Sequence, residues 1–198
     1  MKEGTTDVGA RIAERVRRLR GVRRLSLEEL AAKSGVSRSM ISLVERGESS
    51  PTAIVLDRLA AGLGVTLASL FDAPDGSRAP TGPLARRADQ AEWRDPASGY
   101  VRRNVSPPGA AQPMHIVDVR FPAGARVAFE NPARDLRVHQ QVWVLEGTMD
   151  VTVGRARHRL REGDCLAMQL DRPTMFHNPA RRHARYAVVI ASEPAPRR

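Results

Sequence analysis

The stretch Leu25–Gly47, L-S-L-E-E-L-A-A-K-S-G-V-S-R-S-M-I-S-L-V-E-R-G, contains two short amphipathic segments on either side of a tight turn. Ser26 is a good N-cap for the first segment, and Gly35 can adopt the left-handed conformation that ends a helix. Ser37 is a suitable cap for a second helix. The positions of this second helix that we expect to point inward are apolar, namely Met40, Ile41 and Val44. The stretch therefore predicts two helices joined by a glycine turn.

Two helices with this turn have the architecture of a DNA-binding helix-turn-helix, whose second helix enters the major groove. Residues 9–71 closely resemble the Cro and phage-repressor class, the xenobiotic-response-element family, which implies five helices. Two flanking segments carry the resemblance: V-E-R-G-E-S-S-P-T at 44–52 and L-A-A-G-L-G-V-T-L-A-S-L-F-D at 59–72. A helical hairpin with a purely structural role is the alternative, and these flanking segments argue against it.

The resemblance places DNA contacts at Ser37, Arg38, Ser39, Ser42, Leu43, Arg46 and Thr52. Arg38 can donate two hydrogen bonds to guanine or bind phosphate, and the last two residues of the set are expected at the phosphate backbone. Leu27 departs from the family pattern, which often has a DNA-contacting Gln there, so one polar contact is missing. The family pattern also pairs Arg20 of the first helix with Glu45.

Composition limits the remaining possibilities. The 198 residues have room for two modest domains and carry a net charge of +10. Residues 1–72 hold twelve basic and nine acidic side chains, and the remainder holds twenty and thirteen, so charge alone does not locate the DNA-binding half. The single cysteine, Cys165, fits a reducing compartment and is expected to be buried. Without a secretory signal or an apolar run of about 18 residues, we expect a cytoplasmic, nucleoid-associated protein with no membrane partner.

The chain divides into a helix-turn-helix domain at 1–72, a linker at 73–83 and a second domain at 84–198. The linker reads A-P-D-G-S-R-A-P-T-G-P, a composition that disfavours both helix and strand. After it come short apolar or alternating runs with turn residues between them, at 100–105, 114–121, 142–145, 149–153, 157–160, 165–168 and 184–190. Such regular short runs predict an all-β sandwich or barrel.

The second domain resembles the cupins. V-W-V-L-E-G-T-M-D-V-T-V-G at 142–154 is similar to their first conserved hairpin. L-R-E-G-D-C-L-A-M at 160–168 and D-R-P-T-M-F-H-N-P at 171–179 are similar to the second motif. The resemblance implies a double-stranded β-helix, or jelly-roll, barrel. The expected fold is therefore multidomain, with an α-helical N-terminal and an all-β C-terminal domain.

Many cupins are enzymes that hold a divalent metal at four positions of these motifs. In this chain the four positions fall on Arg134, Leu136, Gln140 and Thr174. An arginine there would repel a cation, so we expect no metal, no other cofactor and no catalytic residues. His139 and His177 are each displaced by an odd number of residues, which places them on the opposite strand face. A bulge could return one of them, so a metal-dependent cupin enzyme with an accessory DNA-binding domain is the alternative function.

A cupin barrel without metal still has a pocket, which we expect to be lined by Arg134, Gln140, Trp143, Met168 and Thr174. Arginine and glutamine suit a carboxylate or another polar anion. The sequence thus predicts a homodimeric, sequence-specific transcriptional regulator, with repression favoured, that binds a double-stranded operator and senses a small polar or anionic effector. A β-domain that only dimerises, and a protein that coats DNA without specificity, remain as alternatives.

Overall fold

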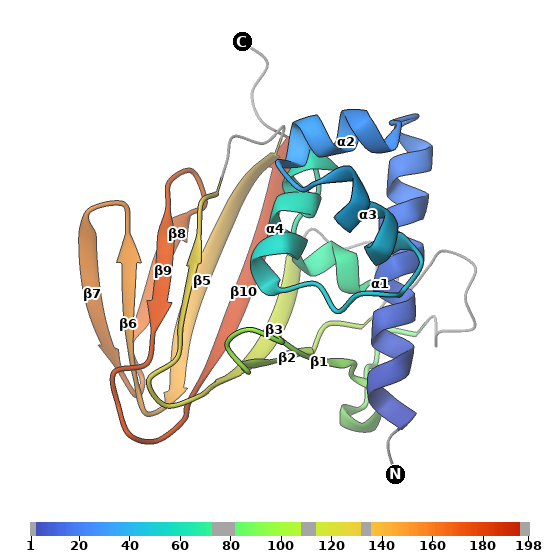
Figure 1. The fold of residues 1–198 in the computed structure, drawn as a ribbon. Helices are drawn as coiled ribbons and strands as arrows, with labels where there is room; N and C mark the ends of the chain where they lie inside the picture. The colour runs from blue at the N-terminus through green and yellow to red at the C-terminus, as the bar shows by residue number, and fades with distance from the viewer. Residues whose placement is uncertain (1–2, 73–81, 108–113, 132–135, 195–198) are drawn as a thin grey trace.

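A helical N-terminal half lies beside a β-rich C-terminal half (Figure 1). The computed structural model describes residues 3–72, 82–107, 114–131 and 136–194. Most of the expected linker falls outside the described residues, and the domain limits at 72 and 84 stay a prediction. None of the helices in these ranges is both long and apolar enough to cross a membrane.

The helical half contains α1 (Glu3–Val22), α2 (Leu27–Ser34), α3 (Arg38–Glu45), α4 (Ala53–Gly62) and the short 3-10 helix η1 (Ala68–Phe71). The expectation of five α-helices is wrong, because the fifth segment is a single 3-10 turn. The amides of Ser69 and Leu70 donate to carbonyls three residues back, at 3.1 and 3.2 Å. A four-residue segment is too short to develop the i→i−4 ladder of an α-helix.

The expected caps define the ends of α2 and α3. Ser26 and Glu29 form a reciprocal capping box at the start of α2, and Gly35 ends that helix with φ of +66°. The hydroxyl of Ser37 accepts from the amide of Met40 at the start of α3. Local sequence therefore fixes the angle at which α3 leaves the turn.

The β-rich half contains η2 (Arg87–Asp89), β1 (Glu92–Arg94), β2 (Val101–Asn104), β3 (Met114–Phe121), β4 (Arg126–Phe129), β5 (Leu136–Glu146), β6 (Thr148–Val153), β7 (Ala156–Arg161), β8 (Cys165–Gln169), β9 (Thr174–His177) and β10 (Ala184–Pro194). One antiparallel sheet has the order β1-β2-β3-β10-β5-β8, and the other has the order β4-β9-β6-β7. Counted from β3, successive barrel strands pass from one sheet to the other except at the β6–β7 hairpin, which is the strand order of a double-stranded β-helix. The cupin architecture implied by the sequence is therefore present.

The two halves are packed against each other. Their buried apolar side chains form one continuous cluster, from Val8 in α1 to Ile190 in β10. In this contact α1 meets β1 and α4 meets β4. Figure 1 shows α4 standing between the rest of the helical half and the long strands β5 and β10. The helix that follows the helix-turn-helix is thus also part of the wall of the β-rich half.

Candidate nucleic-acid interface and interdomain cavity

The position of α3 is fixed by an ion pair with α1. Arg20 donates through Nε and Nη2 to the two carboxylate oxygens of Glu45, at 2.7 and 2.8 Å. Its Nη1 donates to the carbonyl of Leu25, at 2.9 Å. The expected pair is confirmed. The Glu45 carboxylate raises the pKa of Arg20, chiefly through this hydrogen bond. Because Glu45 is largely buried, loss of Arg20 would leave an unpaired charge beside the core.

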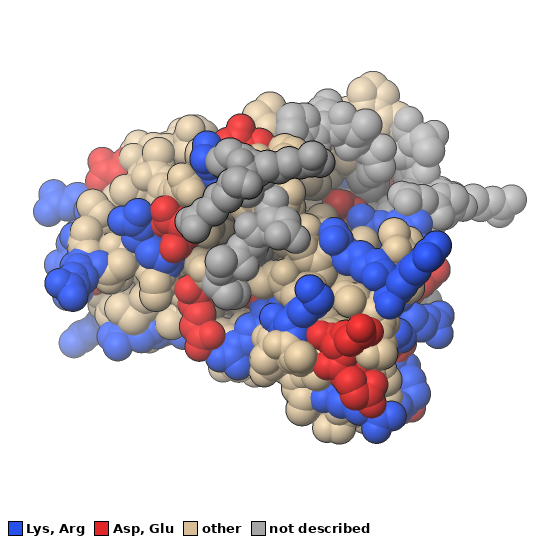
Figure 2. All heavy atoms as spheres, turned by 90° about the horizontal axis from the view of Figure 1, so that it is seen from above, with Lys and Arg blue, Asp and Glu red and all other residues tan. Residues whose placement is uncertain are grey.

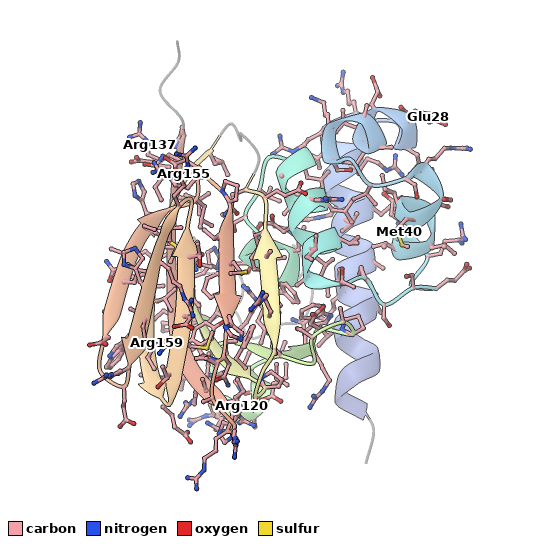
Figure 3. All side chains as sticks on the ribbon, turned by 60° about the vertical axis from the view of Figure 1, so that its left-hand side comes forward. Glu28, Met40, Arg120, Arg137, Arg155 and Arg159 are labelled. Carbon is pink, nitrogen blue, oxygen red and sulfur yellow. The ribbon has the colours of Figure 1, made fainter. Side chains whose placement is uncertain are left out.

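The N-terminal end of α3 is open to solvent. Of the predicted DNA contacts, Ser37, Arg38, Ser39 and Arg46 are exposed, and Ser42, Leu43 and Thr52 are half-buried. Ile41 and Val44 point into the core, and Met40 is half-buried. Glu28 on α2 and Met40 on α3 lie on the side of the helical half that faces away from the sheets (Figure 3). The exposed face of α3 is therefore free of the β-rich half.

The cationic side chains of this face are held by carboxylates. Arg38 pairs with Glu28 at 2.7 Å, and Arg46 pairs with Glu48 at 2.8 Å while also contacting the Ser42 hydroxyl. Seen from above, basic and acidic side chains are interspersed over the helical half at the right of Figure 2. The described part of this face does not form a uniform basic stripe. On binding DNA, Arg38 and Arg46 would leave their carboxylate partners and pair with phosphates or bases.

A second candidate site is a cavity of about 70 Å³ at the junction of the two halves. Its floor and walls are the inner faces of both sheets, which are mainly apolar. The helical half borders it through Asp57 of α4 and through Thr66 and Leu67, the residues before η1. The domain that carries the recognition helix thus forms part of the wall of the cupin interior.

The structure brings only part of the expected pocket together. Gln140 and Thr174 line the cavity. The expectation for Trp143 is wrong, because β5 alternates and places this indole on the outer face, half exposed. Met168 is buried but is not part of the cavity wall. Arg134 lies outside the described residues.

Sequence reasoning missed the arginine that the cavity contains. Arg102 of β2 lines it together with Tyr100 and Asn131. Asn131 has a positive φ of 47° and donates to the Thr174 hydroxyl at 3.0 Å. The signal for Arg102 was the pair of adjacent arginines in an expected strand, since alternation must direct one of them inward.

Three comparisons with known proteins bear on identity. A family model described as helix-turn-helix matches residues 16–70. The HTH-type transcriptional regulator SutR of Escherichia coli is 40% identical over 163 residues, which cover 82% of this chain and 84% of SutR. The chain belongs to the HTH-type transcriptional regulators.

One further relative agrees with that assignment, and one solved structure shares the fold. An uncharacterized HTH-type transcriptional regulator of Sinorhizobium fredii, y4dJ, is 38% identical over 69 residues, covering 35% of this chain and 90% of that one. The crystal structure of an HTH_3 family transcriptional regulator from Vibrio cholerae superposes with a TM-score of 0.74 at 24% identity. The match covers 97% of this chain and 99% of that one, so the two-domain fold as a whole is shared.

His139 and His177 lie on outer strand faces, as the strand alternation predicts. His139 faces outward beside Glu193 at 3.3 Å, and His177 lies 3.7 Å from Asp150 on the outer face of the second sheet. Within the described ranges no three His, Cys, Asp or Glu side chains converge as metal ligands would. The expectation of a buried Cys165 is wrong, since its thiol is exposed on the same outer face as Trp143.

Three contacts join the regulator's two halves. The amide of Ala53, at the start of α4, donates to Oδ1 of Asp95 in the β1–β2 turn at 2.9 Å. Arg58 of α4 pairs with Glu130 at 2.7 Å. The ring of Phe71 packs edge-on against Trp93, with centroids 5.6 Å apart. These contacts join α4 and η1 to the β-rich half, while Asp57 of α4 itself lines the cavity.

Proposed function

We propose that this regulator binds a pseudo-palindromic operator as a homodimer and represses transcription, acting in the cytoplasm at the nucleoid. The observation that carries the proposal is the exposed N-terminal face of α3, with Ser37, Arg38 and Ser39 open to solvent and the helix fixed by the Arg20–Glu45 pair. A recognition helix presented in this way reads base edges through its first residues.

Dimerisation follows from the number of contacts that one such domain can make. A single small module buries less surface than specific operator binding needs, and two-fold symmetric half-sites match paired recognition helices. The outer face of the six-stranded sheet offers a surface for the second copy. Its exposed apolar side chains include Met114 and Ile116 of β3 and Trp143 of β5, with β10 between the two strands. We assign this outer patch, defined by those three residues, to the dimer contact.

The cavity suits a receptor for a small effector. It is lined in part by α4 and by the residues before η1, so a molecule inside it contacts both halves. An effector that prefers one arrangement of the halves would shift the spacing of two recognition helices in a dimer. The cavity wall favours binding over catalysis. Two of the four positions that hold a metal in cupin enzymes lie on the described part of this wall, and here they are Gln140 and Thr174. Stoichiometric iron, manganese, nickel or zinc in the purified protein would overturn the proposal that the cavity binds an effector and does not catalyse a reaction.

The function is tested by selecting operators from a random duplex library and measuring affinity by fluorescence anisotropy. The Arg38→Ala variant should weaken binding to the selected operator by roughly tenfold or more, since a bidentate base contact is worth about 1–3 kcal/mol. Binding to random DNA should fall much less. Arg155→Ala, at an exposed position in the turn between β6 and β7 (Figure 3), is the matched control and should leave both affinities unchanged. Equal losses on operator and random DNA would indicate nonspecific coating instead.

Repression is tested separately with a reporter whose promoter carries the selected operator. Supplying the regulator should lower reporter output, and the Arg38→Ala variant should restore it. A rise in output on adding the wild-type protein would make it an activator.

A further inference from the structure

Two arginines sit side by side on β2 and face opposite sides of the sheet. Arg102 pairs in register with Val119 and faces the cavity, and Arg103 pairs with Asp118 and faces outward. Both side chains are buried, and each residue is 6% exposed. Their surroundings differ completely, and the difference indicates what each one does.

Arg103 has the partners that a structural arginine needs. Its Nε donates to Glu92 at 2.7 Å, and a second nitrogen contacts the same carboxylate. Its Nη1 donates to Asp118 at 3.4 Å, and Arg185 holds that aspartate from the other side at 2.9 Å. The buried charge is therefore neutralised by a network that spans four strands, β1, β2, β3 and β10.

Arg102 lacks such a network. Its Nε makes one long hydrogen bond, 3.3 Å, to the amide oxygen of Asn104. Its guanidinium carbon lies 4.8 Å from the centre of the Phe71 ring, and among the described residues its Nη2 has no hydrogen-bond acceptor although it is fully buried. Burial lowers the pKa of this guanidinium. An unpaired buried charge is costly to keep, and this one lines the cavity.

The rest of the wall defines what could complete the site. The phenols of Tyr100 and Tyr186 also line the cavity, and burial raises their pKa values, so both stay neutral hydroxyls. Asp57, at the α4 side, is the acidic group among the described lining residues. Most of the remaining surface is aliphatic or phenyl. Because Asp57 already has an interaction partner of its own, the Arg102 cation, the neutral hydroxyls and the apolar wall match an anionic head group on a small apolar body.

We propose that Arg102 binds the carboxylate of a small organic acid, whose body fills the cavity under α4. This deepens the proposed function and rests on it for the regulatory meaning of the ligand. The size of the cavity sets the class. About 70 Å³ corresponds to roughly five to seven water-sized groups, so acids of three to six non-hydrogen atoms fit without rearrangement. The ligand would replace the missing acceptor of Nη2 at the point where the Phe71 ring of the helical half covers the same guanidinium.

The test is isothermal titration of the full-length protein with acetate, propionate, butyrate, pyruvate and lactate. Acetamide, propionamide and butyramide serve as uncharged counterparts. At least one carboxylate should bind saturably, and its amide should bind at least tenfold more weakly, because a hydrogen bond to a charged group is worth about tenfold or more. Arg102→Gln should abolish binding, and Arg102→Lys should restore part of it.

Arg103→Gln is the matched control, equally buried on the neighbouring position, and Arg120→Gln is a second control that keeps the outer network intact. Both should bind the acid as the wild type does, with folding checked by circular dichroism. The proposal is overturned if no acid of the panel binds saturably, if the amides bind equally well, or if Arg102→Gln binds normally. Operator affinity is measured in parallel. If the operator binds but no acid does, the acid site is refuted and the proposed function stands. If an acid binds but no operator does, the proposed function is refuted and the acid site stands.

Discussion

The amide of Ala53 donates to Oδ1 of Asp95 at 2.9 Å, so the first turn of α4 is capped by a carboxylate from the β-rich half. Asp95 is 2% exposed and also accepts from the amide and hydroxyl of Ser98, at 2.8 and 2.5 Å. An anionic acceptor at a helix N-terminus is favoured by the exposed amides and the helix dipole. The contact is part of a helix cap and at the same time part of the interface between domains.

Removing the Asp95 carboxylate should weaken both the cap of α4 and the contact between the two halves. We expect Asp95→Ala to lower the free energy of unfolding by about 1–2 kcal/mol, the usual value of a lost cap together with a buried amide left unsatisfied. Asp95→Asn keeps an acceptor oxygen and should lose less. Urea denaturation measures the difference, with the exposed Asp89→Ala as control. Wild-type stability in Asp95→Ala would show that the cap adds nothing.

Glu28 competes with DNA for Arg38. The two side chains are exposed and 2.7 Å apart, and exposed pairs of this kind contribute only about 0–1 kcal/mol. Glu28→Gln should therefore leave the melting temperature unchanged and raise operator affinity by roughly two- to fivefold. Anisotropy titrations at several salt concentrations check this, and the gain should shrink as salt screens the carboxylate. The exposed Glu162→Gln variant on the β-rich half should have no effect.

The outer patch should control the oligomeric state. Ile116 and Trp143 are 43% and 50% exposed, and a charge placed between two apolar faces is strongly unfavourable. We expect Ile116→Asp to convert the dimer to a monomer by light scattering and to weaken operator binding at least tenfold. Val22→Asp, at an exposed apolar position at the end of α1, is the control. A dimeric Ile116→Asp variant would exclude this face as the contact.

Asp150 should make the β-rich half sensitive to acid. Hydrogen bonds from Arg159, at 2.8 and 3.1 Å, and from Arg157, at 2.5 Å, hold the pKa of this carboxyl well below its usual range. A depressed folded-state pKa gives stability that is present above the unfolded value of about 4 and is lost as pH falls toward the folded one.

Asp150→Asn should therefore be less stable than wild type at pH 7, by about 1–2 kcal/mol. The gap should narrow below about pH 4. Thermal denaturation of both proteins across pH 2.5–7 measures this, and a gap that stays constant with pH would contradict it.

The two buried arginines of β2 should respond oppositely to replacement. Arg103→Met strips partners from Glu92 and Asp118 and should cost about 2–3 kcal/mol. Arg102→Met removes a poorly paired buried charge and should leave stability unchanged or raise it. Chemical denaturation of the ligand-free protein separates them. An equal loss in both variants would mean that Arg102 already has its full set of partners.

Local signals in the sequence predict much of the helical half. The Ser26 and Ser37 caps, the Gly35 turn and the Arg20–Glu45 pair all depend on residues close in sequence or on a well-known pattern, and all are present. A fifth α-helix was expected because Thr66 is a suitable N-cap residue. Its hydroxyl does accept from the Ser69 amide at 3.2 Å, but the helix ends after one 3-10 turn.

The β-rich half shows where single-sequence reasoning stops. The short apolar or alternating runs expected as strands coincide with β2, β3, β5, β6, β7, β8 and β10. The strands β1, β4 and β9, each three or four residues long, were not expected. The outward position of His139 follows from strand period alone, and Trp143 shares that parity. The interdomain role of Arg102 could not be predicted, because it depends on which strands pair and on which helix covers them.

The regulator's only two tryptophans lie on opposite faces of one sheet. Trp93 is buried against Phe71, at the contact between the halves, and Trp143 is half exposed on the outer patch. Because indole emission shifts with solvent exposure, the chain carries two intrinsic fluorophores with separate reporting positions. A Trp143→Phe chain would emit from the domain contact alone, and a Trp93→Phe chain from the outer face alone. Occupancy of the interior and association of subunits could thus be followed independently, in unlabelled protein and in real time.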